Sequence, residues 1–265
     1  MVGDELSGGE TQRRAAALLP ALAARDDGGV TDLGSAHVLV LGATGGLGGP
    51  IARRLAAAGA RLTISSRDAA RLEAIAAELG SAVVTTVTAD LTRPDGPASV
   101  VRAATDGAPL TGVVNAAGVV AFGAVENLDD DTLDEVLLLD LVAPVRLARA
   151  AIGVLPEGGF LVQVSAVVAE KAMPGMAAYS AAKAGLTAFD AALASELRRR
   201  RIRVLDVRPP HTETGLATRP VAGEAPRLPQ GLSPDAVAER IVRALADDER
   251  DLPSTAFTAT PPTPS

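Results

Sequence analysis

Six short runs rich in valine, isoleucine and leucine recur along the chain, and each is separated from the next by a longer segment of alanine, leucine and arginine. The runs are Ala36–Leu41, Ala60–Ser65, Ala82–Thr88, Thr111–Asn115, Gly159–Ser165 and Ile202–Val207. Near-continuous apolar runs are typical of strands covered on both faces, and their alternation with helices indicates parallel strands joined by right-handed crossovers. We therefore predict an α/β fold in which a doubly wound parallel sheet lies between two layers of helices.

The pattern predicts a single domain over residues 36–257, with a short region on either side. A final helix is predicted after Ser233, which can cap its first turn, and a short strand is expected near Ala256. Residues 1–35 are expected to form a helical extension, with an amphipathic helix over 11–25 that packs on the domain or on a second subunit. Residues 258–265 have the composition of a disordered tail.

The composition argues against several classes of partner. A formal net charge of −7 and an aromatic content of 2% disfavour nucleic acid, whose binding requires a basic face or stacking rings. The chain has no cysteine and only two histidines, so no metal site is expected. It has no uncharged apolar run of about 18 residues, and acidic residues precede its first apolar segment, so neither a membrane span nor a secretory signal is expected. We predict a small-molecule partner and a cytoplasmic location.

A glycine-rich turn directly follows the first predicted strand. Gly42, Gly46 and Gly48 come within seven residues, and apolar residues at helical spacing follow until Gly59, where the helix is expected to end. Glycine lets the backbone approach a pyrophosphate, and the N-terminus of the next helix offers free N–H groups to the anion. This context predicts a dinucleotide site, with an ordinary tight turn in an alanine-rich protein as the alternative.

The second predicted strand ends in the sequence Ile-Ser-Ser-Arg-Asp. An acid at this place typically holds a free ribose 2′-hydroxyl, whereas a 2′-phosphate requires a cation and hydrogen-bond donors. Ser66 and Arg67 supply such donors, so NADP is predicted in preference to NAD, although Asp68 favours NAD. The alternative is that Arg67 simply begins the solvent-exposed face of the next helix.

Tyr179 is the only tyrosine in the chain, and Lys183, one of two lysines, follows it at helical spacing. Residues four apart share one face of a helix, and an ammonium beside a phenol stabilises the phenolate. We therefore expect the pKa of Tyr179 to be lowered from about 10, which would make the phenol a usable acid or base near neutral pH. The alternative is that Tyr179 merely packs within an amphipathic helix.

Taken together, these motifs resemble the classical short-chain dehydrogenase/reductase (SDR) family over Ala36 to Phe257. The family motifs are matched by GATGGLG, ADLT, NAAG, YSAAK and RPPHTET, with Leu41 in place of the usual threonine. The resemblance implies a Rossmann-type, three-layer α/β/α fold and a nicotinamide cofactor. The residues that it implies for cofactor binding are Gly42, Thr44, Gly45, Gly46, Leu47, Gly48, Asp90, Leu91, Asn115, Ala116, Ala117, Gly118, Tyr179, Lys183, Thr212 and Thr214.

The resemblance also implies roles for individual residues and an assembly. Tyr179 would be the proton donor, and Lys183 would both modify its pKa and bind the nicotinamide ribose. A homodimer or homotetramer would form through the fourth and fifth helices. The apolar segment Val136–Leu155 suits such an interface and could equally belong to the core.

Two positions depart from the family pattern. Alignment without gaps places the family's catalytic serine at Ala166, and Ser165 is one residue early. Adjacent strand residues face opposite sides, so Ser165 can reach a substrate only if the strand has ended or bulged there. The family's asparagine, which holds a water of a proton relay, falls at Asp140, which could also hold water. His211 and Thr212 are candidates for a replacement donor, with a plain loop role as the alternative for His211.

The expected function is NADP-dependent interconversion of a carbonyl and a secondary alcohol by hydride transfer, on a medium-sized and largely apolar substrate. The predicted substrate contacts are Val167, Val168, Met173, Met176, Phe122 and the segment His211–Leu232, which suits a mobile lid. Three alternatives stay open. The bound cofactor could serve an epimerase, dehydratase or cyclase, the protein could be a non-catalytic partner, or it could be a nucleotide-regulated binding module.

Overall fold

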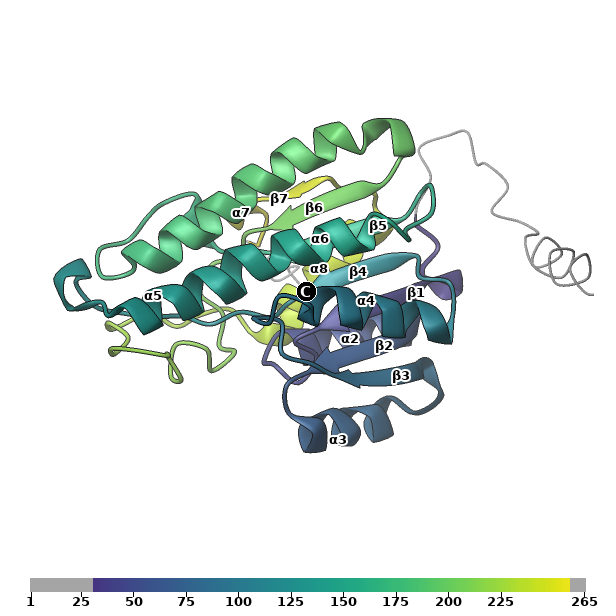
Figure 1. The fold of residues 1–265 in the computed structure, drawn as a ribbon, viewed down its shortest axis with the longest axis horizontal. Helices are drawn as coiled ribbons and strands as arrows, with labels where there is room; N and C mark the ends of the chain where they lie inside the picture. The colour runs from purple at the N-terminus through teal and green to yellow at the C-terminus, as the bar shows by residue number, and fades with distance from the viewer. Residues whose placement is uncertain (1–30, 258–265) are drawn as a thin grey trace, which may run out of the picture. The chain divides into compact units, whose positions relative to one another are not determined.

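A computed structural model of the chain describes residues 31–257, and the predicted sheet lies at its centre (Figure 1). Seven parallel strands pair in the order β3-β2-β1-β4-β5-β6-β7. Their bounds are β1 His37–Leu41, β2 Arg61–Ser66, β3 Val83–Thr88, β4 Gly112–Asn115, β5 Phe160–Val164, β6 Arg203–Val207 and β7 Asp251–Leu252. The order reverses between β1 and β4, and in such sheets ligands bind outside the carboxyl ends of the strands at that point.

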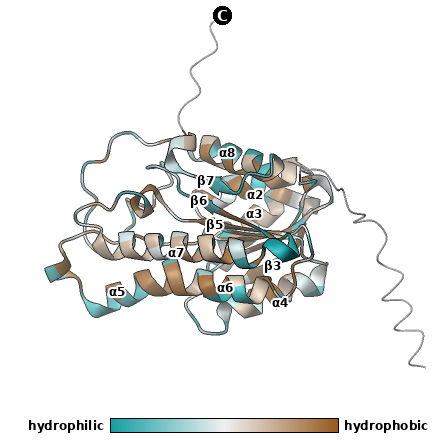
Figure 2. Cartoon of the chain, turned by 90° about the horizontal axis from the view of Figure 1, so that it is seen from above, coloured by the Kyte–Doolittle hydropathy of each residue, from teal (hydrophilic) through white to brown (hydrophobic). Residues whose placement is uncertain are grey.

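Helices cover both faces of the sheet, as Figure 2 shows. On one face lie α2 (Gly48–Ala57), α3 (Ala69–Leu79) and α8 (Pro234–Ala246), and on the other lie α4 (Gly96–Gly107), α5 (Asp130–Leu137), α6 (Ala143–Ala151) and α7 (Ala177–Glu196). Successive residues of β1 alternate between two apolar cores: Val38 and Val40 belong to the first, and Leu39 and Leu41 to the second. The predicted three-layer α/β/α fold is confirmed.

Side-chain caps explain where the helices near the strand ends begin. Asp68 accepts a hydrogen bond from Arg71 N in the first turn of α3, and Ser233 caps α8 in the same way. By contrast, α2 follows Leu47 without any side-chain cap. In that first turn Gly49 N donates to Gly45 O at 3.1 Å and Pro50 has no N–H, so Gly48 N is the group left for another partner.

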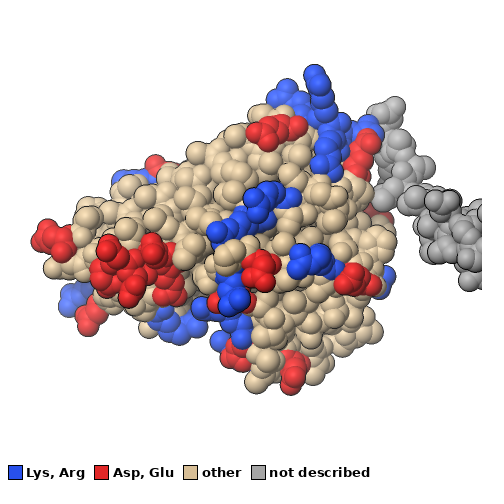
Figure 3. Space-filling view, viewed as in Figure 1, with Lys and Arg blue, Asp and Glu red and all other residues tan. Residues whose placement is uncertain are grey.

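A short acidic helix, α5, continues into α6 through a π-helical turn. Asp129 caps α5, and Asp130 and Asp131 follow in the first turn, where the helix dipole favours negative charge. The space-filling view shows acidic side chains gathered over this helix (Figure 3). The π turn spans Leu138–Val142 and contains Asp140. Turns of this kind add one residue to a helix and are frequent at functional sites.

The C-terminal strand lies earlier than the sequence predicts. The prediction places it near Ala256, whereas β7 is Asp251–Leu252 and pairs with the end of β6. Pro253 has no N–H with which to continue the ladder, so Ser254–Phe257 form a 3₁₀ turn instead.

The regions flanking the predicted domain are covered only in part. The predicted helix over 11–25 and the predicted tail over 258–265 lie outside the described residues. From the extension, Leu33–Ser35 form a 3₁₀ turn that is capped by Asp32. Among the helices of the described range, none is both long enough and apolar enough to cross a bilayer.

Candidate functional site

A large cavity opens at the carboxyl ends of the strands, near the point between β1 and β4 where the strand order reverses. Its volume is about 670 Å³, and residues that follow β1, β2, β4, β5 and β6 all contribute to its wall. The predicted site residues that line it are Gly42, Thr44, Gly45, Gly46, Leu47, Ser66, Arg67, Leu91, Ala116, Ala117, Gly118, Ser165, Tyr179, Lys183, Thr212 and Thr214. Gly48, Asp90, Asn115 and Asp140 do not line it. The topology therefore brings most of the predicted residues to one site.

The glycine-rich turn leaves space that side chains would fill. A Cβ on Gly46 would lie 2.2 Å from Thr214 O, and one on Gly48 would lie 2.1 Å from Gly42 O. Gly42 has a φ of +73°, and a Cβ there would approach the Ala116 backbone to 2.8 Å. This open backbone leads into the uncapped N-terminus of α2. The two features together fit the pyrophosphate of a dinucleotide.

The wall after β2 is polar and carries two guanidinium groups. Asp68, which weighs toward NAD in the sequence, caps α3, and Asp68 N donates to Ser66 Oγ at 3.1 Å. Arg67 is exposed on the cavity wall, and Arg71 Nη2 donates to Thr44 O at 2.6 Å, beside the glycine-rich turn. Sequence reasoning missed Arg71, and the available signal was its position four residues after Arg67 on the predicted helix.

The predicted contacts after β3 and β4 divide between the cavity wall and its support. Leu91 lines the cavity, whereas the Asp90 carboxylate accepts from Thr92 Oγ1 at 2.7 Å and from Thr92 N at 3.0 Å. These hydrogen bonds lower the pKa of Asp90. Asn115 Nδ2 donates to Gln163 Oε1 at 3.0 Å and so joins β4 to β5. Asp90 therefore stabilises the turn after β3, and Asn115 joins two strands, and neither lines the cavity.

Tyr179 and Lys183 reach the cavity from the same face of α7. Lys183 Nζ lies 5.7 Å from the centroid of the Tyr179 ring and donates to Val164 O at 3.1 Å. It also pairs with Asp140 Oδ1 at 3.0 Å, and the side chains of Lys183 and Asp140 are 4% and 0% exposed. Asp140 comes from the π turn, and its other oxygen accepts from Val119 N at 3.4 Å. Three of the four predicted catalytic residues thus form one cluster.

The expected lowering of the Tyr179 pKa is contradicted by the structure. Burial raises the pKa of the phenol, and the Asp140 carboxylate raises it further. The prediction counted the positive charges of Lys183 and of the cofactor ring. For the protein alone it was wrong because it did not count burial, which is the larger cause, or the Asp140 carboxylate, which pairs with the Lys183 ammonium.

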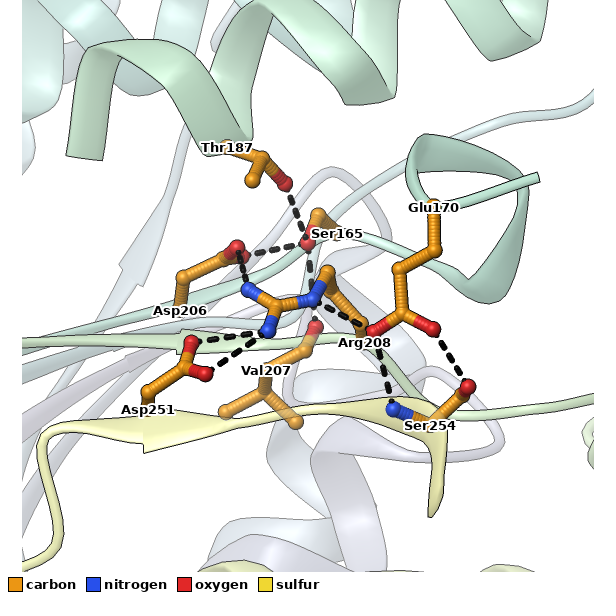
Figure 4. Close-up of polar contacts among 8 residues, drawn as sticks. All are labelled: Ser165, Glu170, Thr187, Asp206, Val207, Arg208, Asp251 and Ser254. Carbon is orange, nitrogen blue, oxygen red and sulfur yellow. Dashed lines mark hydrogen bonds and ion pairs between the residues drawn. The ribbon is translucent and has the colours of Figure 1, made fainter. Parts of the chain in front are cut away.

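Ser165 directs its hydroxyl toward the Asp206 carboxylate (Figure 4). Its Oγ donates to the Asp206 carboxylate, lies 3.2 Å from Val207 O, and accepts from Thr187 Oγ1 at 3.3 Å. Ser165 N also donates to Val207 O at 2.8 Å, so the pairing of β5 with β6 continues through this residue. Although β5 ends at Val164, the hydroxyl of Ser165 is engaged within the protein and is not offered to a ligand. Its proton is held by Asp206.

Asp206 belongs to a partly buried ionic cluster around Arg208 (Figure 4). Arg208 pairs with Asp206, with Glu170 at 2.7 Å and with Asp251 at 2.8 Å. Glu170 also accepts a hydrogen bond from Ser254 N at 3.0 Å. The cluster connects the turn after β5 to β6, β7 and the C-terminal 3₁₀ turn. It thereby fixes one wall of the cavity to the end of the sheet.

The substrate side of the cavity is apolar and lacks a serine hydroxyl. Ala166 lines the cavity at the position where the family's serine is expected. The apolar side chains around it, all of them predicted substrate contacts, are Phe122, Val167, Val168, Met173 and Met176. This part of the wall can exclude water from a reacting carbonyl but offers it no hydrogen bond.

The segment after β6 forms the opposite wall. An isolated bridge between Ala121 and Ala222 attaches the segment to the rest of the domain, and a second bridge, between Thr212 and Leu232, joins the two ends of the segment. Thr212 Oγ1 donates to Pro210 O at 2.8 Å, so its hydroxyl proton is already engaged in a hydrogen bond. Cavity residues that sequence reasoning did not name are Val119, Val120, Leu139 and Pro209.

A parallel sheet in this strand order, with a glycine-rich turn at the point of reversal and a tyrosine and a lysine in the adjoining cavity, defines a dinucleotide-binding enzyme. The model of the short chain dehydrogenase family matches residues 36–224. The chain belongs to the short-chain dehydrogenase/reductase family, and it is an NAD(P)-dependent enzyme of that family.

Individual relatives agree with this assignment. An uncharacterized oxidoreductase of Methylorubrum extorquens is 32% identical over 227 residues, which are 80% of this chain and 91% of the relative. A short chain dehydrogenase of Burkholderia cenocepacia, solved in complex with NADP, is 28% identical, with a TM-score of 0.76 over 85% of this chain and 99% of that one. The angucycline C-6 ketoreductase LanV, solved with bound NADP, is 26% identical, with a TM-score of 0.73 over 84% and 95%.

Proposed function

We propose that this protein uses NADPH to reduce a carbonyl group of a medium-sized, largely apolar substrate to a secondary alcohol. The observation that carries the proposal is the shared cavity, whose wall includes both the glycine-rich turn and the Tyr179 and Lys183 side chains. The relatives solved with NADP, one of them a ketoreductase, support the same assignment. A cytoplasmic location is part of the proposal.

The preference for NADP rests on the charges of the wall after β2. Arg67 and Arg71 both line this wall, and guanidinium groups can bind a 2′-phosphate with paired donors. Asp68 is the acid that would favour a free ribose hydroxyl, but its carboxylate caps α3. The balance of donors and acids therefore favours the phosphorylated cofactor.

In the proposed reaction the cofactor, when bound, supplies the hydride that the carbonyl carbon takes up. Tyr179 holds the proton, and its O–H bond breaks as the carbonyl oxygen becomes a hydroxyl, so that negative charge does not build up on that oxygen. The phenolate that is left regains a proton from water. Lys183 fixes the wall beside Tyr179 through Val164, and the apolar residues around Ala166 exclude water during the step.

A second candidate function follows from Ala166 and from the hydrogen bonds of Ser165. Neither residue offers a hydroxyl proton to the cavity, so a reacting carbonyl would lose one hydrogen bond. For a comparable donor such a loss costs on the order of 100-fold in rate. An SDR protein that uses its cofactor for non-redox chemistry, or that has lost catalysis, is therefore the alternative.

The test is Tyr179→Phe, measured as NADPH oxidation against a panel of ketones and quinones. We expect turnover to fall by at least about 100-fold because the general acid is removed. NADPH affinity, followed by the fluorescence of the bound nucleotide, should be largely retained.

Ser180→Ala is the matched control for this variant. It removes a neighbouring buried hydroxyl from the same helix, and that hydroxyl has no hydrogen-bond partner and does not line the cavity. It should leave turnover unchanged. Equal rates for Tyr179→Phe and the wild-type protein would exclude the phenol from the reaction, and a wild-type protein that binds NADPH but oxidises none of it would support the second candidate.

A further inference from the structure

The Lys183 ammonium has a buried counter-ion. Asp140 Oδ1 lies 3.0 Å from Lys183 Nζ, and neither side chain is appreciably exposed to water. A Cβ on Gly118 would lie 2.6 Å from that carboxylate oxygen and 3.5 Å from the ammonium, so the cavity wall closes tightly over the pair. In such surroundings the attraction between the two charges is only weakly screened. The pair therefore acts on its neighbours as a unit of no net charge.

Tyr179 is the titratable neighbour on which this neutralisation acts. An ammonium a few ångströms from a phenol favours the phenolate, and an added carboxylate cancels that effect. The phenol is buried, which itself disfavours the charged form. With the ammonium paired, the attraction that would offset the burial of a phenolate is largely cancelled.

Other charged groups lie on the elements around Asp140, Lys183 and Tyr179, and several of them form ion pairs elsewhere. Those on the elements packed around these three residues and on the cavity wall are Arg67, Asp68, Arg71, Asp130, Asp131, Asp134, Glu135, Arg146, Arg149, Glu170, Lys171, Asp190, Glu196, Arg203, Asp206, Arg208, His211 and Arg219. Glu170 and Asp206 pair with Arg208. Beyond burial, Asp140 is the group that acts on the phenol.

We propose that Asp140 is the counter-ion that neutralises Lys183 and so keeps Tyr179 in its protonated form throughout the neutral and mildly alkaline range. This inference rests on the proposed function, because a protonated phenol is the form needed for carbonyl reduction and the opposite of the form needed to oxidise an alcohol. Asp140 is thus a positioning residue that sets the pH range over which Tyr179 can donate its proton.

The chain offers a direct measurement of this effect. It contains one tyrosine and no tryptophan, so the ultraviolet absorbance of tyrosinate reports on Tyr179 alone. The experiment titrates the protein without cofactor or substrate, comparing wild type with Asp140→Asn. An amide of the same shape keeps the packing but removes the charge that neutralises Lys183.

We expect wild-type Tyr179 to remain protonated beyond the ordinary tyrosine value of about 10, up to the pH at which the protein unfolds. In Asp140→Asn the unpaired ammonium should lower the midpoint by about one to three pH units. Asp134→Asn, which removes an exposed acid of α5, should titrate as wild type does. Circular dichroism at each pH defines the range over which each protein is folded.

Two results would overturn the proposal. One is a wild-type midpoint below about 10 in the folded protein, which needs no variant to observe. The other is coincident curves for wild type and a folded Asp140→Asn. Because this titration requires no turnover, it stands even if the panel of ketones and quinones reveals no substrate. Conversely, an active enzyme with coincident titration curves would retain the proposed function and lose only the role of Asp140.

Discussion

Ala166 stands where the site most clearly lacks a hydrogen-bond donor. It lines the cavity between the end of β5 and the 3₁₀ turn Val167–Ala169, and its backbone is extended, with φ of −169° and ψ of 163°. Any residue can adopt this conformation, so a hydroxyl could be introduced without backbone strain. Ser165 cannot take over the role, because its proton is held by Asp206.

We predict that Ala166→Ser increases the turnover of carbonyl reduction. The new hydroxyl would add a donor beside the reacting oxygen, and comparable donors are worth about 100-fold in rate, so a gain of tenfold or more is expected. The measurement is kcat for the best ketone found with wild type. Ala169→Ser, on the same turn but outside the cavity lining, is the control and should give no gain. An unchanged kcat in Ala166→Ser would mean that this position is not the missing donor.

At the scale of elements, the junction of β2 with α3 carries the proposed preference for NADP. Ser66 ends the strand, Asp68 caps the helix, and the arginines at 67 and 71 lie on either side of that cap. One short connection therefore supplies both the donors for a phosphate and the acid that a free ribose would need. The Asp68 carboxylate caps α3, so the donors of this connection are the groups that can bind a ligand.

We expect Arg67→Ala to weaken NADPH binding by about tenfold to 100-fold, which corresponds to the loss of a hydrogen bond to a charged group, and to leave NADH binding almost unchanged. Titration with each nucleotide provides the comparison. Arg61→Ala, at the opposite end of β2, is the control. If both nucleotides were weakened equally, Arg67 would not be the residue that distinguishes them.

The elements themselves could be predicted from sequence because each depends on local patterns. Six apolar runs predicted β1 to β6 within a residue or two, and Ser233 predicted the start of α8. The roles of Ser165 and Tyr179 could not be predicted in this way. They depend on carboxylates that tertiary folding brings from elsewhere: Asp206 from β6 and Asp140 from the π turn.

At the scale of the whole molecule, the interior contains a titratable group that does not line the cavity. Asp190 of α7 is buried, and neither oxygen of its carboxyl has a clear hydrogen-bond partner. Burial raises its pKa to about 8, and the nearby Asp206 contributes to the increase. The folded protein therefore holds a proton on Asp190 that the unfolded chain releases at an ordinary pKa of about 4.

From this difference we predict that stability falls as pH rises from about 4 to about 8, and that Asp190→Asn removes this part of the pH dependence. The upper limit of the effect is about 6 kcal/mol, from about four pH units at about 1.4 kcal/mol each. Thermal unfolding of both proteins across this range measures it. Glu196→Gln, an exposed change on the same helix, is the control. A constant difference between Asp190→Asn and wild type at every pH would contradict the prediction.

The family resemblance also leads us to propose a homodimer or homotetramer, with the helices α5, α6 and α7 at its interface. The segment Val136–Leu155 contributes to the core through Val136, Leu139 and Leu147, while Leu138, Leu141 and Val142 remain partly accessible. The same helices also carry Asp140, Tyr179 and Lys183. An interface here would therefore involve the same helices that position Asp140, Tyr179 and Lys183.

Because Asp140 lies in the π turn Leu138–Val142, its position depends on the number of residues in this stretch as well as on their identity. A regular helix advances about 100° per residue, so one residue more or fewer ahead of Asp140 would rotate the carboxylate around the axis and away from Lys183. Related proteins with identical side chains but a different residue count in this stretch would then differ in the acidity of their tyrosine. Insertions and deletions, and not only substitutions, are thus a route by which this scaffold can shift the pH range over which its tyrosine donates a proton.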